Sequence, residues 1–161
     1  MDEEIHDLAF TLNGEHLELR VAARLNLADL IRGTLHRTGT HVGCEHGVCG
    51  ACNILVDGRS VRSCLMLAVQ ADGAEVQTIE GLTQSGAIAD LQAEFVARNA
   101  LQCGYCTSGI LATAAEMLNG PGLSRAEIRE AMSGNFCRCT GYHAIVDAIE
   151  AVMKKRQGAA P

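Results

Sequence analysis

The chain of 161 residues contains eight cysteines, which fall into two groups of four. The first group, Cys44, Cys49, Cys52 and Cys64, has the spacing C-x4-C-x2-C-x11-C. The second group consists of a C-x2-C pair, thirty intervening residues and a C-x-C pair, namely Cys103, Cys106, Cys137 and Cys139. A [2Fe–2S] cluster is bound by four cysteine thiolates. Two such clusters use all eight cysteines, so the count predicts a protein that carries electrons.

The first group favours iron and sulfide over zinc, although zinc also binds four thiolates. Zinc sites typically use two separated C-x2–4-C pairs, whereas here the C-x4-C and the C-x2-C share Cys49. Disulfides are the remaining alternative. Gly43, Gly47 and Gly50 lie among these cysteines, and we expect them to adopt positive φ so that backbone amides point at sulfur. Such N–H···S hydrogen bonds raise the reduction potential of a cluster.

The second group is less diagnostic by spacing alone. Its C-x-C pair, separated by Arg138, is tighter than the usual zinc spacing. Each pair precedes a predicted helix, so the dipoles of two helix N-termini would favour one anionic cluster. His41 and His46 flank Cys44 and raise the alternative of a mixed His/Cys site of the Rieske kind. Because four cysteines already complete each set, we expect both histidines to be exposed loop residues.

No other chemistry is indicated by the sequence. The cysteines lack a nearby base and orienting group, and the loop 43–51 lacks the Gly-Lys-Ser/Thr end of a phosphate loop. The formal net charge of −6 argues against nucleic acid as a partner. No apolar stretch approaches the roughly 18 residues of a membrane span. The acidic start, residues 1–4, is no secretory signal, so we expect reduced thiols in the cytoplasm.

The elements that must position these cysteines change in type along the chain. Alternating apolar residues predict strands at 8–12 and 17–21, joined by an Asn13-Gly14 turn. Asn26 can cap a helix whose apolar face extends to residue 35. A second hairpin is predicted at 54–61, with its turn at Asp57-Gly58, and a last strand at 76–79.

After Gly81 the apolar period changes from that of strands to that of helices. Four helices are indicated around 91–95, 110–118, 124–132 and 145–153, and Ser124 with Glu127 forms a capping box at the start of the third. The segment 80–85 is the predicted connection. The sequence therefore predicts an α+β fold, with a β-rich domain at 1–80 and a helical domain at 86–161.

Three segments carry a family resemblance: Gly43-Cys-Glu-His-Gly-Val-Cys-Gly-Ala-Cys52, Gln102-Cys-Gly-Tyr-Cys-Thr107 and Gly134-Asn-Phe-Cys-Arg-Cys-Thr-Gly-Tyr142. In this order they resemble the iron–sulfur subunit of the molybdenum hydroxylases, the xanthine oxidase, aldehyde oxidoreductase and carbon monoxide dehydrogenase family. The resemblance covers nearly the whole chain, from about residue 9 to 152. One departure is visible, because the family commonly has Cys-Thr-Pro-Gly where this chain has Cys106-Thr-Ser-Gly109.

The resemblance implies a plant-ferredoxin-like β-grasp domain with one [2Fe–2S] cluster on the first cysteine group, followed by a four-helix domain with another cluster on the second group. It also implies a heterotrimer, which can pair into a dimer of heterotrimers. A large subunit would carry molybdenum on a pterin dinucleotide and oxidise the substrate, and a medium subunit would carry FAD. Electrons would pass from molybdenum through the helical-domain cluster and the β-domain cluster to FAD. Gln102 and the Cys139 region would touch the pterin.

Two other functions are compatible with the cysteine pattern. A freestanding two-cluster ferredoxin would be monomeric and would reduce diffusible acceptors unaided. A zinc scaffold or redox sensor would be colourless and would contain neither iron nor acid-labile sulfide.

Overall fold

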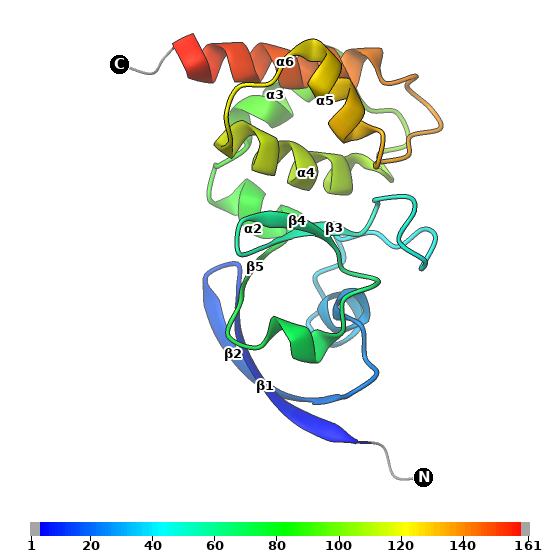
Figure 1. The fold of residues 1–161 in the computed structure, drawn as a ribbon, viewed down its shortest axis with the longest axis vertical. Helices are drawn as coiled ribbons and strands as arrows, with labels where there is room; N and C mark the ends of the chain where they lie inside the picture. The colour runs from blue at the N-terminus through cyan, green and yellow to red at the C-terminus, as the bar shows by residue number, and fades with distance from the viewer. Residues whose placement is uncertain (1–3, 159–161) are drawn as a thin grey trace.

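The structure is a computed structural model that describes residues 4–158. Residues 1–3 and 159–161, which include most of the acidic start and the outer ends of both predicted domain ranges, lie outside the described residues. A sheet half and a helical half are stacked along the long axis (Figure 1). None of the described helices is long and apolar enough to cross a membrane.

The N-terminal half contains a mixed five-stranded sheet in the order β2-β1-β5-β3-β4. Its strands are β1 (Ile5–Leu12), β2 (Glu15–Ala22), β3 (Asn53–Val56), β4 (Arg59–Arg62) and β5 (Glu75–Gln77). β1–β2 and β3–β4 are antiparallel hairpins, whereas β1 and β5 pair in parallel. Both hairpin turns lie where the sequence predicts them, with Asn13 and Asp57 at φ 53° and 50°.

The predicted helix at 26–35 is only partly correct. Asn26 caps it as expected, because its side-chain oxygen accepts a 2.8 Å hydrogen bond from the Asp29 amide. However, α1 (Leu27–Asp29) is one short turn, and the chain continues as a π turn, η1 (Leu30–Thr34). Gly33, a poor helix former, lies in this wider turn. Leu27 and Leu30 are nevertheless fully buried, so the apolar face serves the core of this half as predicted.

The helical half contains the four predicted helices, and a further helix precedes them. They are α3 (Ala89–Ala97), α4 (Thr107–Asn119), α5 (Arg125–Met132) and α6 (His143–Gly158). The predicted connection at 80–85 is itself helical, as α2 (Ile79–Gln84), and a 3-10 turn, η2 (Ala68–Ala71), precedes β5. The last strand therefore ends at Gln77 rather than residue 79, because Ile79 begins α2 and Leu82 is buried in the helical core.

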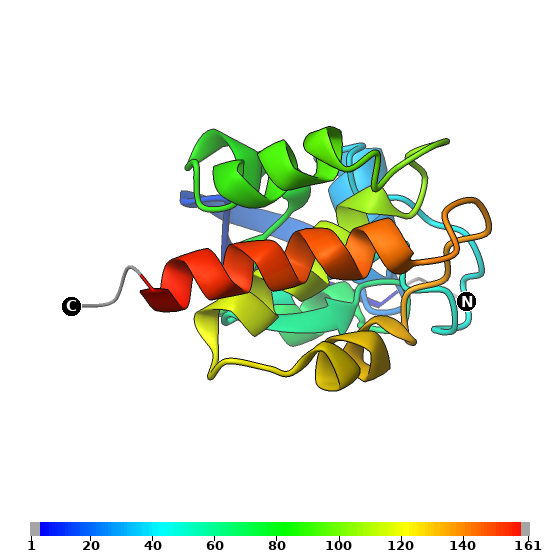
Figure 2. The ribbon, with the colours of Figure 1, turned by 90° about the horizontal axis from the view of Figure 1, so that it is seen from above.

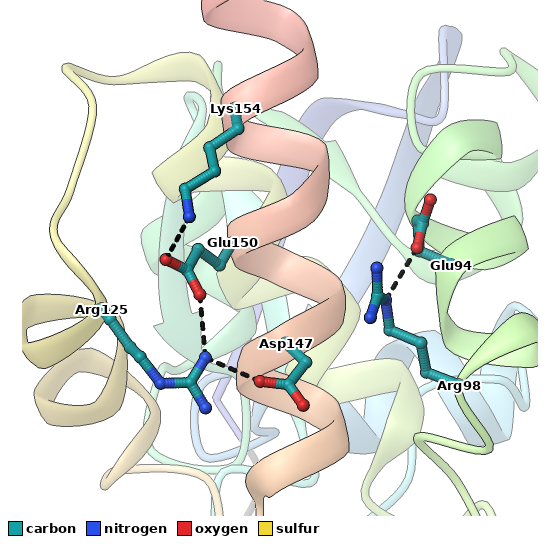
Figure 3. Close-up of polar contacts among 6 residues, drawn as sticks. All are labelled: Glu94, Arg98, Arg125, Asp147, Glu150 and Lys154. Atoms are coloured by element: carbon teal, nitrogen blue, oxygen red, sulfur yellow. Dashed lines mark hydrogen bonds and ion pairs between the residues drawn. The ribbon is translucent and has the colours of Figure 1, made fainter.

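Helix α6 packs against both α3 and α5. Seen from above, it crosses the molecule with α3 on one side and α5 on the other (Figure 2). Its stripe of Ile145, Ile149 and Val152 is fully buried. At the start of α5, Arg125 bridges to Asp147 at 2.6 Å and to Glu150 at 2.8 Å (Figure 3). These contacts tie the start of α5 to the N-terminal half of α6, the helix that follows the second cysteine group.

Candidate iron–sulfur sites

The first cysteine group lies on the loop that leads into β3 and just after β4. Cys52 is buried and the other three thiols are partly exposed. The Cys49 amide donates a 3.4 Å hydrogen bond to the Cys44 sulfur. Backbone amides of Cys49 and His46 lower the pKa of the Cys44 thiol to about 6, and burial beside Cys52 raises that of Cys64 to about 11. Amides thus point at sulfur here, as the glycine-rich sequence predicts.

The three loop glycines do not all serve the expected purpose. Gly47 and Gly50 have the predicted positive φ, at 79° and 73°. The prediction for Gly43 is wrong, because it is not among the positive-φ residues; a Cβ there would lie 3.3 Å from the Cys49 sulfur, so close packing explains the glycine. Glu45 adopts a positive φ instead, at 57°. A Cβ on Gly47 would also come within 2.2 Å of Leu65, which covers the loop.

The second cysteine group lies on the two loops that precede α4 and α6. Cys106 is the N-cap residue of α4, and Cys103 and Cys139 are exposed. Burial beside Cys137 raises the pKa of Cys106 to about 12. Burial acts in the same direction on Cys137, but its pKa is lowered because the Thr140 hydroxyl, 3.1 Å away, and backbone amides outweigh it. The two cysteine-bearing loops are therefore in contact with each other.

All eight thiols are free, and they lie in contacting pairs. The pairs are Cys44 with Cys49, Cys52 with Cys64, Cys103 with Cys139 at 3.6 Å, and Cys106 with Cys137. A [2Fe–2S] cluster needs two thiolates for each of its two irons, with sulfides between the irons. Two contacting pairs of thiols in each group fit the two irons of such a cluster.

The two sites meet at Cys49. Its carbonyl oxygen accepts a 2.7 Å hydrogen bond from the Phe136 amide, and Phe136 is bonded to Cys137. Cys49 and all four thiols of the second group line one cavity of about 190 Å³. One hydrogen bond and one peptide bond therefore connect Cys49 of the first group with Cys137 of the second.

Buried polar residues join the halves, and the sequence reading missed them. Asn53 and Asn135 are 3 % and 2 % exposed. The side-chain Nδ2 of Asn53 donates to Thr113 Oγ1 at 2.7 Å, and the side-chain Nδ2 of Asn135 donates to the Gly50 carbonyl at 3.1 Å. The only sequence signal was an asparagine in each of two cysteine-bearing segments.

His41 and Tyr105 form a second link between the halves. His46 is exposed as predicted, but His41 is only partly exposed, because its ring stacks on Tyr105 at 4.7 Å between centroids. The Tyr105 hydroxyl also donates to the Val42 carbonyl at 2.7 Å. Ser108, where the family commonly has proline, is 8 % exposed and its hydroxyl lies 3.5 Å from His41 Nδ1. The serine that stands in place of the family's proline therefore makes its contact within this chain.

Gln102, predicted to lie near a pterin, has an exposed side chain beside the second group. Its amide nitrogen donates a 3.1 Å hydrogen bond to the Cys139 carbonyl. The two residues predicted to share this role are therefore neighbours in space.

Two known domain families match this chain, one over the part that contains the first cysteine group and one over the part that contains the second. Residues 10–83 match the 2Fe-2S iron-sulfur cluster binding domain, and residues 78–150 match the [2Fe-2S] binding domain. The chain is 50 % identical over 151 residues to the gamma subunit of caffeine dehydrogenase from Pseudomonas sp. (strain CBB1), covering 91 % of this chain and 90 % of that one. It is 42 % identical over 163 residues to the iron–sulfur-binding subunit of aldehyde oxidoreductase from Escherichia coli (strain K12), covering 91 % of this chain and 71 % of the relative.

The chain belongs to the iron–sulfur subunits of the molybdenum hydroxylases. Among solved structures, quinoline 2-oxidoreductase from Pseudomonas putida 86 matches with a TM-score of 0.86 and 48 % identity, over 96 % of this chain and 98 % of that chain. The predicted α+β fold and the presence of two [2Fe–2S] domains in this iron–sulfur subunit are thereby confirmed.

Proposed function

We propose that this chain is the electron-transfer subunit of a cytoplasmic heterotrimeric molybdenum hydroxylase. Its first cluster is bound by Cys44, Cys49, Cys52 and Cys64, and its second by Cys103, Cys106, Cys137 and Cys139. Electrons pass from molybdenum on a pterin dinucleotide in the large subunit to the second cluster, then to the first, and finally to FAD in the medium subunit. The chain itself binds no substrate.

The contact between the two sites carries this proposal. The 2.7 Å hydrogen bond from the Phe136 amide to the Cys49 carbonyl joins a ligand of the first set to the residue that precedes Cys137, a ligand of the second set. The [2Fe–2S] clusters supply one-electron chemistry when bound. The chain's own residues hold the two sets side by side, because Cys49 and the four thiols of the second group line the same cavity.

Exposed apolar side chains support one partner at each site. Val48 and Leu65, 44 % and 59 % exposed, surround the first cysteine loop. Leu101, Tyr105 and Phe136, between 38 % and 54 % exposed, surround the second. A freestanding ferredoxin would be expected to carry polar residues there, whereas a buried interface favours apolar and aromatic ones. We assign the first patch, Val48 and Leu65, to the medium subunit. The second patch, Leu101, Tyr105 and Phe136, lies beside Gln102, and we assign it to the large subunit and its pterin.

Isolation of the tagged chain from its native cells tests the assembly. Molybdenum, FAD and iron are measured in the purified complex, and its mass distinguishes one heterotrimer from a pair. Val48→Asp should deplete FAD while leaving molybdenum bound, because it places a charge in the first patch only. Leu101→Asp should deplete molybdenum while leaving FAD bound.

Ile5→Asp is the matched control. Ile5 is 43 % exposed, like Val48, but it is the first residue of β1, a strand at the opposite end of the molecule from α4, α5 and α6 (Figure 1). This variant should retain both partners. A wild-type chain that is monomeric, holds four irons and lacks molybdenum and FAD would instead select the freestanding ferredoxin.

A further inference from the structure

Arg62, the last residue of β4, connects both cysteine loops to its own strand. Its Nε donates a 3.0 Å hydrogen bond to the carbonyl of Gly47, between Cys44 and Cys49 in the first loop. Its Nη2 donates at 2.6 Å to the carbonyl of Gly134, in the loop that leads to Cys137. Its Nη1 donates to Asn53 Oδ1, in the residue that follows Cys52. A single guanidinium thus binds the backbone of both loops.

The charge on Arg62 is not neutralised by a carboxylate. Its three acceptors are two carbonyl oxygens and one amide oxygen, all neutral. Among residues 4–158, no acidic side chain forms an ion pair with it. The residue is partly buried, so water screens this charge less than it screens an exposed arginine. Arginine also stays protonated at any physiological pH.

We propose that Arg62 raises the reduction potential of the first [2Fe–2S] cluster through this uncompensated charge. Reduction adds one electron and hence one negative charge to the cluster, with no bond made or broken. A fixed cation hydrogen-bonded to the ligand loop stabilises the reduced state more than the oxidised state. A higher potential of the first cluster favours electron transfer to it from the second cluster. The inference rests on the proposed ligand set of the first cluster, but not on the identity of the partner subunits.

Redox titration of the complete chain with both clusters, followed by electron paramagnetic resonance, measures the two potentials separately. Arg62→Gln removes the charge and keeps a hydrogen-bond donor. At a fixed solution potential it should lower the reduced-to-oxidised ratio of the first cluster about tenfold, which is about 59 mV for a one-electron couple. The second cluster should shift less. Arg62→Lys retains the charge and should leave the potential of the first cluster close to that of the wild type.

Arg59→Gln is the matched control, because Arg59 lies on the same strand but is exposed. It should shift neither cluster. Equal shifts in Arg62→Gln and Arg62→Lys would overturn the proposal, since they would reflect a lost contact rather than a lost charge. An unshifted Arg62→Gln protein with four irons would also overturn it, while leaving the proposed relay intact.

If Arg62→Gln does not load iron, Asn53→Asp provides the same test. It keeps the side chain's size and places a carboxylate against the Nη1 of Arg62. The potential of the first cluster should then fall as in Arg62→Gln. An unchanged potential would contradict the role of the charge.

Discussion

Three of the four thiols of the first site lie within nine residues of one loop, whereas the second site joins two loops separated by thirty residues. In the first, the backbone shapes the site locally, through positive φ at Glu45, Gly47 and Gly50 and through amides that point at the Cys44 sulfur. In the second, Cys103 and Cys139 meet only because α4 and α6 pack in the same bundle. Loop conformation therefore builds one site and helix packing builds the other.

The two sites should therefore be lost in response to different substitutions. Changes in the helical core should release the second site while sparing the first, and changes in the sheet core should do the reverse. The Cys49–Phe136 hydrogen bond connects the site that depends on the sheet core with the site that depends on the helical core.

The largest effects are expected from the thiols themselves. Cys49→Ser should remove the first cluster, so iron should fall from four to about two atoms per chain. In the holoenzyme, molybdenum should remain bound while turnover with a flavin-dependent acceptor stops. Cys137→Ser should remove the second cluster and also weaken binding of the large subunit. Metal analysis and turnover assays measure these outcomes, and turnover by Cys49→Ser would contradict the proposed relay order.

A matched pair of core truncations sharpens the comparison. Ile149 in α6 and Ile31 in the π turn are both fully buried, in the helical core and the sheet core respectively. Each change to alanine should cost about 2–5 kcal/mol of unfolding free energy, from lost burial and a cavity. Denaturant titration with the two cluster signals followed separately should show the second cluster lost first in Ile149→Ala, and the first cluster in Ile31→Ala. The same order in both variants would contradict two separately built sites.

The helix caps allow the same comparison with smaller effects. Ser124 caps α5 in a complete capping box, and Asn26 caps α1. Alanine at either position should cost about 1 kcal/mol. Ser124→Ala should speed the loss of iron to a chelator from the second site, because α5 leads into the loop that carries Cys137. Asn26→Ala should act only on the first site, and chelation rates followed by visible absorbance measure both.

The smallest effect is expected at Glu80, whose carboxylate ties α2 to the chain ahead of the first loop. It accepts a 2.8 Å hydrogen bond from the Gly39 amide and a 2.6 Å bond from the Thr78 hydroxyl. Burial alone would raise its pKa, but these bonds outweigh burial and lower the pKa below 4.5.

Because the folded-state pKa of Glu80 is depressed, its stabilisation is present above pH 4.5 and is lost as pH falls through the folded pKa. Glu80→Gln should therefore lose less than about 1 kcal/mol at pH 7, the usual net value of a hydrogen bond. Urea titrations at pH 7 and at progressively lower pH should show the difference from wild type shrinking. A difference that grows on acidification would assign the effect to another group.

Much of the fold could be predicted because it depends on local patterns. The hairpins at Asn13 and Asp57 follow from turn residues between alternating strands, and α3 to α6 follow from apolar periodicity. The π turn and α2 were missed because tertiary contacts override weak local preferences: Leu30 and Leu82 are buried whatever the type of turn. The role of Gly43 does not follow from local sequence, because the atom that a Cβ there would approach, the Cys49 sulfur, lies six residues away.

The number, type and grouping of the sulfur ligands follow directly from the amino-acid sequence, since eight cysteines in two sets of four leave little freedom for other chemistry. How the two sets lie relative to each other depends on the packing of the two halves. Cys49 lies beside Phe136, His41 stacks on Tyr105 and Arg62 reaches both loops because α4 packs on β3, which brings distant segments within hydrogen-bond reach. Such contacts leave no periodic trace in the chain, because each joins single residues that are far apart in sequence.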